Sequence, residues 1–79
     1  MWNQRESPFR VEKRFEFEEY QNISKFMKMV DELCKETNIY PNISFGKNFV
    51  SITVFLASEK ISKIEKDFSN QIDNYFVEI

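Results

Sequence analysis

The sequence predicts an α+β fold in which two helices pack on one face of a four-stranded antiparallel sheet. Apolar residues alternate with polar ones in short segments, and they recur every three or four residues in two longer segments. The two kinds of segment follow each other in the order (β)-β-α-β-β-α, which is typical of an antiparallel sheet with helices on one side. We therefore expect residues 1–79 to form a single domain.

The first clear strand spans residues 9–17, where four apolar side chains fall on one face and charged side chains fall on the other. The apolar face consists of Phe9, Val11, Phe15 and Phe17. Only Lys13 interrupts this face. Residues 2–5 are expected to form a short partner strand, with residues 6–8 as the turn between them.

The first helix begins near Glu19 and ends at Asn38, shortly before Pro41. Glu18 and Glu19 suit the positive N-terminal end of a helix. An apolar stripe along this segment is expected to face the core. The stripe consists of Ile23, Phe26, Met27, Val30, Leu33 and Cys34.

Two further strands are expected at residues 43–45 and 49–56, joined by a turn in which Gly46 would adopt a positive φ. The second helix opens with Ser62 and Glu65, which match a capping box. Its predicted buried face consists of Ile61, Ile64, Phe68, Ile72 (with Gln71 as the alternative), Tyr75 and Ile79.

The composition excludes several classes of protein. The formal charge is −2 with both signs interspersed, so we expect no nucleic-acid partner. No apolar segment approaches the roughly 20 residues needed to cross a bilayer, and a polar start to the chain suggests a cytoplasmic location. The chain has one cysteine and no histidine, which argues against an internal disulfide and a zinc site. A domain this small is marginal alone, so we expect it to self-associate.

Few side chains suit proton transfer near neutral pH, because the chain has no histidine. Three carboxylate pairs lie among lysines, as solvated surface charges do. These pairs are Glu18/Glu19, Asp31/Glu32 and Glu65/Asp67. Cys34 lies on an apolar stripe, where a free cysteine usually behaves as a small buried hydrophobe. We expect no cofactor.

Several motifs together resemble the pterin-4a-carbinolamine dehydratase family, over about residues 2–76. They are Phe15-x-Phe17-x-x-Tyr20, Phe26-Met27 with Val30, the run Asn38-Ile39-Tyr40-Pro41-Asn42-Ile43-Ser44, the run Val50-Ser51-Ile52-Thr53-Val54, and Ile61-Ser62. The resemblance implies an α+β domain whose sheets pair edge to edge in dimers, which often form tetramers.

The resemblance does not extend to the family's catalytic residues. The adjacent histidines of the family fall on Ile39 and Tyr40, and the residue before them falls on Asn38. The family's helix glutamate falls on Lys35, and its third histidine falls on Ala57. The enzyme moves protons between a bound pterin and these imidazoles, and losing one such group typically costs about 10²–10⁴-fold in rate. The resemblance thus implies a non-catalytic protein.

One branch of dehydratase-like proteins without these histidines is associated with α-carboxysomes, where it is proposed to assist RuBisCO assembly. The resemblance to this branch implies that the partners of this protein are RuBisCO subunits and that it is located at the carboxysome. The candidate contact residues are Ile39, Tyr40, Ile43 and Phe55, beside Ala57. A second explanation is equally good: these residues fill the space that the active-site pocket occupies in the catalytic members of the family. The alternatives are a residual or altered dehydratase that uses Tyr40, Cys34 or a carboxylate, and a pterin-binding module without turnover.

Overall fold

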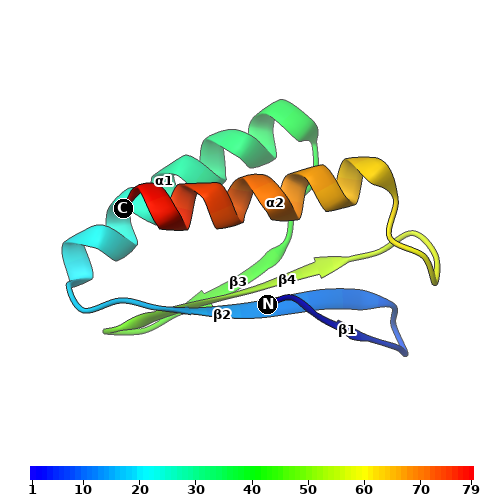
Figure 1. The fold of residues 1–79 in the computed structure, drawn as a ribbon, viewed down its shortest axis with the longest axis horizontal. Coiled ribbons are helices and arrows are strands. Elements are labelled where there is room, and N and C mark those ends of the chain that lie inside the picture. The colour runs from blue at the N-terminus through cyan, green and yellow to red at the C-terminus, as the bar shows by residue number, and fades with distance from the viewer.

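Two helices cover one face of a four-stranded antiparallel sheet, and no element covers the other face (Figure 1). The computed structural model describes all of residues 1–79. The elements are β1 Asn3–Arg5, β2 Arg10–Glu16, α1 Tyr20–Thr37, β3 Asn42–Phe45, β4 Phe49–Phe55 and α2 Lys63–Glu78. The strand order is β1-β2-β4-β3. The predicted fold class and element order are confirmed.

The two central strands, β2 and β4, place their apolar side chains toward the helices. Val11 lies opposite Val54, and Phe15 lies opposite Val50. Val50, Ile52 and Val54 are completely buried. Because strand side chains alternate between faces, Arg10, Glu12, Arg14 and Glu16 of β2 point to the open face. The apolar and polar side chains that alternate along this part of the sequence therefore lie on opposite faces of the sheet, as predicted.

Helix α1 buries the predicted stripe and ends at a residue in the left-handed conformation. Asn38 has a φ of 60°, and its N–H donates a hydrogen bond to the carbonyl oxygen of Cys34 at 2.8 Å. Asparagine tolerates this conformation better than most residues, because its short polar side chain can hydrogen-bond locally. The predicted end of the helix is thus confirmed at Thr37, with Asn38 as its cap.

Helix α2 begins with the predicted capping box. The Ser62 hydroxyl accepts a hydrogen bond from the N–H of Glu65, and the Glu65 carboxylate accepts one from the N–H of Ser62. Phe68 and Ile72 are buried against α1 and the sheet. The predictions for Ile64 and Ile79 are wrong, because these residues are 67% and 37% exposed, and Ile79 follows the last helical residue, Glu78. Ser69 is buried instead, and its hydroxyl donates to the carbonyl oxygen of Glu65.

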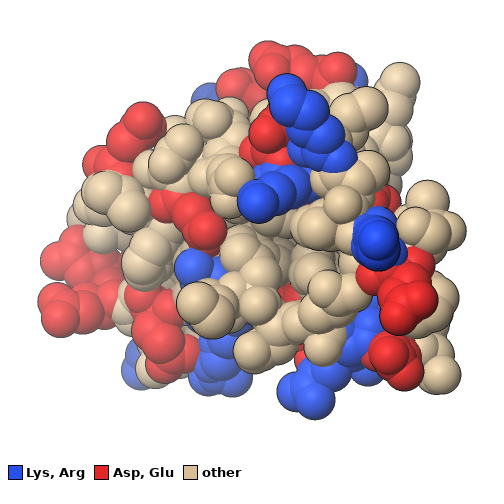
Figure 2. All heavy atoms as spheres, turned by 45° about the vertical axis from the view of Figure 1, so that its right-hand side comes forward, with Lys and Arg blue, Asp and Glu red and all other residues tan.

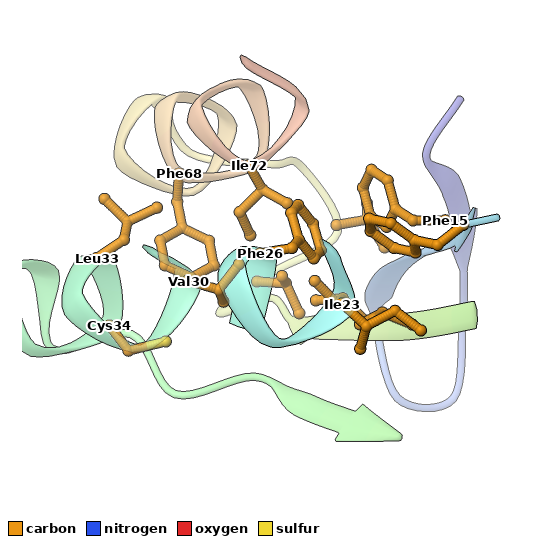
Figure 3. Packing of buried hydrophobic residues seen from close by; sticks show 13 residues of the cluster. Phe15, Ile23, Phe26, Val30, Leu33, Cys34, Phe68 and Ile72 are labelled. Atoms are coloured by element: carbon orange, nitrogen blue, oxygen red, sulfur yellow. The ribbon is translucent and has the colours of Figure 1, made fainter. Parts of the chain in front are cut away.

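The core lies between the sheet and the two helices (Figure 3). Phe68 and Ile72 descend from α2 toward Val30 and Phe26 of α1, whereas Cys34 points away from α2. The Phe26 ring lies 5.0 Å from that of Phe15 and 6.1 Å from that of Phe76, between ring centroids. Aromatic pairs at these separations stabilise a core beyond the area they bury.

The turn between β3 and β4 corrects one expectation. Gly46 does not have a positive φ. A Cβ atom at this position would overlap the Phe49 ring, so glycine is required by space rather than by backbone conformation. Its N–H donates to the carbonyl oxygen of Phe49 at 3.0 Å and closes the hairpin.

Lys13 remains on the helix-covered face of β2 because it has a partner there. Its Nζ lies 2.8 Å from Oδ1 of Asp73 on α2. The indole N–H of Trp2 donates to the same carboxylate at 3.1 Å. This polar cluster of Trp2, Lys13 and Asp73 joins the N-terminal segment, the sheet and α2. No buried side-chain nitrogen or oxygen atom of the protein lacks a hydrogen-bond partner.

A matched pair of substitutions on α2 tests this packing. Replacing Ile72 by valine should lower the free energy of unfolding by about 1 kcal/mol, because the lost methyl group leaves a cavity. Replacing Ile64 by valine should change it by less than about 0.5 kcal/mol, because that side chain is exposed. Urea unfolding followed by circular dichroism measures both. Equal losses would contradict the assignment of the buried face.

Candidate functional site

The candidate site lies where the segment between α1 and β3 passes the end of β4. Asn42, the first residue of β3, pairs with Thr53 of β4. Residues 39–41 precede Asn42 and therefore run alongside the last residues of β4. The end of α1, the end of β4 and the start of α2 all lie on the right-hand side of Figure 1. The fold thus gathers most of the predicted site residues at one end of the molecule. Figure 2 turns this end toward the viewer and shows acidic and basic side chains interspersed on the surface.

The residues of this segment differ in exposure. Ile39 is half-buried against the core, and its N–H donates to the Thr37 hydroxyl at 3.3 Å. Tyr40 follows with 67% of its side chain exposed. Lys35 is exposed on the last turn of α1, where its Nζ lies 3.1 Å from Oδ2 of Asp31. Lys35 therefore serves here as a surface charge.

The structure does not bring all candidate contact residues to one surface. Ile43 pairs with Ile52 and packs, half-buried, against the core on the helix side. Phe55 pairs with Arg10, and 46% of it is exposed on the open face. Because side chains of paired residues point to the same face of a sheet, Ile43 and Phe55 point in opposite directions. Only Tyr40 and Phe55 are large exposed groups in this set.

Ala57 lies just beyond β4, and its backbone is held by Glu65. The Ala57 N–H donates to Oε2 of Glu65 at 3.1 Å. One carboxylate thus fixes both the start of α2 and the loop that leaves β4. The capping box was readable from the spacing of Ser62 and Glu65, but this second contact spans eight residues and has no local signal in the sequence.

These hydrogen bonds act on the carboxyl group of Glu65. Partial burial raises its pKa, but the donors from Ser62 and Ala57 outweigh burial and leave the pKa below its ordinary value. The charged form of Glu65 is therefore the one that the folded state prefers. No group of three His, Cys, Asp or Glu residues is placed to hold a metal ion.

Cys34 is poorly placed as a nucleophile. It is buried in the core, and burial raises the pKa of its thiol, with a further contribution from the Asp31 carboxylate. A nucleophilic cysteine needs the thiolate form, which a raised pKa disfavours. The side chain acts as a small hydrophobe.

Two shallow depressions lie beside the candidate site. One, of about 390 Å³, is on the strands β3 and β4 and is lined mostly by small polar side chains. Its lining residues are Pro41, Asn42, Ile43, Ser44, Ser51 and Thr53. The other, of about 470 Å³, lies between the helices and includes Leu33, Thr37, Ile64 and Phe68.

No helix combines the length and apolar character that crossing a membrane requires.

Comparison with solved structures identifies the class of protein. The chain is similar to a pterin dehydratase-like protein identified as a RuBisCO assembly factor in the alpha-carboxysome. The identity is 30%, the TM-score is 0.86, and the match covers 95% of this chain and 88% of the other. The chain therefore belongs to the pterin dehydratase-like family.

A second solved structure shares the fold. It is a transcriptional coactivator/pterin dehydratase from Brucella melitensis, with 13% identity, a TM-score of 0.80, and coverage of 94% of this chain and 80% of the other. At this identity the likeness concerns the fold alone. No protein-family model and no curated protein sequence matches the chain.

The contacts of Glu65 predict a pH-dependent contribution to stability. Replacing Glu65 by alanine should lower the free energy of unfolding by about 1 kcal/mol at pH 7. Because the folded pKa lies below the unfolded value of about 4.3, this contribution is complete above pH 4.3 and is lost as the pH falls through the folded pKa. Urea unfolding of both proteins at decreasing pH measures the difference.

Asp67 provides the matched control for Glu65. It is on the same turn of α2, exposed, and 3.6 Å from Nζ of Lys63 in an ion pair that contributes little. Alanine at position 67 should leave the free energy of unfolding nearly unchanged at every pH. A loss at position 65 that persists unchanged to acidic pH would refute the role of the carboxylate.

Proposed function

We propose that this protein is a non-catalytic member of its family that assists the assembly of RuBisCO in α-carboxysome formation. One observation carries the proposal: a similar solved structure, 30% identical over 95% of this chain, is that of a RuBisCO assembly factor in the alpha-carboxysome. The absence of histidine from the chain supports it, because the family's proton transfer depends on imidazole. The protein would then act in the cytoplasm, at the carboxysome.

The proposed contact surface centres on Tyr40 and Phe55. Both aromatic side chains are large and exposed, and such residues contribute most of the binding energy at many interfaces. Ile39 and Ile43 would support this surface from beneath, since both pack against the core. In this arrangement the apolar side chains at the former catalytic positions maintain the shape of the segment that presents Tyr40.

Residual dehydratase activity is the weaker alternative. It would have to use Tyr40, Cys34 or a carboxylate. Cys34 is buried with a raised thiol pKa, and the carboxylates of Asp31 and Asp67 are engaged in surface ion pairs with lysines. The depression beside the site is shallow and polar, whereas small-molecule sites usually enclose most of their ligand.

Co-expression with RuBisCO tests the proposed function. The protein should raise the yield of RuBisCO holoenzyme, measured by native electrophoresis and carboxylase activity. Replacing Tyr40 and Phe55 by alanine should remove most of this gain, because the exposed aromatic surface is lost. Tyr20 provides the matched control: it is an exposed tyrosine at the opposite end of α1, and alanine there should preserve the gain.

Two outcomes would contradict the proposal. A holoenzyme yield that does not respond to the protein would refute the assembly role. Turnover of a pterin carbinolamine by the purified protein, faster than in buffer and reduced by replacing Tyr40 with phenylalanine, would show that the protein is an enzyme.

We further propose that the protein forms a homodimer by pairing sheet edges across a two-fold axis, with a homotetramer as the higher assembly. Strands β1 and β3 each leave one edge unpaired, and exposed edges tend to pair unless they are protected. Light scattering at micromolar concentration should give at least twice the chain mass of 9.6 kDa. A monomeric mass would count against the dimer.

A further inference from the structure

The open face of the sheet has an unusual charge distribution. The chain has three arginines, and Arg5, Arg10 and Arg14 all lie on strands β1 and β2 with their side chains on this face. Only two acidic strand residues, Glu12 and Glu16, share the face. The open face therefore carries one net positive charge, whereas the remainder carries three net negative charges, given the total of −2.

Arg5 and Arg14 keep part of their hydrogen-bonding capacity free. Arg10 is mostly engaged: its Nη1 donates to the carbonyl oxygens of Glu6 and Pro8, and its Nε lies 3.6 Å from Oε2 of Glu12. Arg5 contacts Glu12 through Nε at 3.0 Å, and Arg14 contacts Glu16 through Nε as well. The terminal guanidinium nitrogens of Arg5 and Arg14 have no acceptor within the chain, and more than half of each side chain is exposed. A guanidinium held by Nε is oriented in advance for a second carboxylate.

Aromatic rings and shallow depressions adjoin these arginines. The Arg14 guanidinium lies 4.0 Å above the Phe49 ring, which restricts its orientation. Arg10 lies opposite the exposed ring of Phe55. Between the two arginine–phenylalanine pairs, the face carries Ser51 and Thr53, whose small side chains border depressions of about 390 and 230 Å³. No helix or strand lies over this face, which leaves it accessible to an extended polypeptide.

The spacing of the arginines indicates what such a polypeptide would contain. Arg10 and Arg14 are four residues apart on one strand, which corresponds to about 13 Å. An extended segment places the side chains of every fourth residue on the same side at the same spacing. Nucleic acid is a poor fit, because Glu12 and Glu16 would repel its phosphates and the net charge is only +1.

We propose that the open face of the sheet binds an extended acidic polypeptide segment whose carboxylates are four residues apart, one at Arg5, which lies opposite Arg10, and the next at Arg14. The aromatic rings of Phe49 and Phe55 flank the segment. The inference goes beyond the proposed function, because peptide binding can be measured without RuBisCO.

The test uses a synthetic peptide with glutamate at every fourth residue, separated by serine and threonine. Titration into isotopically labelled protein should shift the resonances of the three arginine Nε–H groups and of the amides of β2 and β4. The double variant Arg5→Gln/Arg14→Gln should bind about tenfold more weakly, since each exposed ion pair contributes up to about 1 kcal/mol. The matched control Lys25→Gln/Lys28→Gln removes two positive charges from α1 and should bind as wild type does.

Three outcomes would overturn the proposal: equal weakening by both double variants, resonance shifts confined to the helices, or equal binding of a peptide whose glutamates are adjacent. The first and last would indicate general charge attraction. Tighter binding of a single-stranded oligonucleotide of equal charge would exclude a polypeptide as the preferred ligand. Circular dichroism of each variant separates loss of binding from loss of fold.

Discussion

The ring of Phe26 holds the two layers of this protein together. It contacts Phe15 of β2, Phe17 just beyond that strand, and Phe76 of α2, with centroid separations of 5.0, 5.3 and 6.1 Å. Sheet, first helix and second helix therefore share one aromatic cluster. A domain of this size buries a modest fraction of its surface, so a few large rings supply much of its apolar contact.

Packing and backbone geometry together keep the candidate site in shape. The cluster holds the first half of α1 against the sheet where Phe15 lies opposite Val50, and at the other end of α1 Asn38 directs the chain into β3. Apolar packing of Ile39 and Ile43 holds this connection from below. The segment that carries Ile39 and Tyr40 is thus held by packing and backbone geometry.

Periodic patterns in the sequence predicted the elements well, because each strand and helix buries one face. The capping box could also be predicted, since Ser62 and Glu65 are three residues apart in the sequence.

Contacts between residues far apart in the sequence could not be predicted from these patterns. Ile64 fits the helical stripe, yet it lies beyond the edge of the core and is exposed. Gly46 was assigned to a turn correctly, but the Phe49 ring that excludes a side chain there appears only in three dimensions. The resemblance places Ile43 and Phe55 in one candidate contact set, but their positions in the sheet point the two side chains to opposite faces.

The pairing of Lys13 with Asp73 has a consequence for how strand β2 aligns with its neighbours. Shifting a strand by one residue moves all of its side chains to the other face. In β2 such a slip would remove Lys13 from its carboxylate, turn the charged side chains of Glu12 and Arg14 toward the helices, and move Val11 and Phe15 to the open face. A single charged residue within an otherwise apolar face therefore marks the correct alignment and makes the misaligned sheet much less stable.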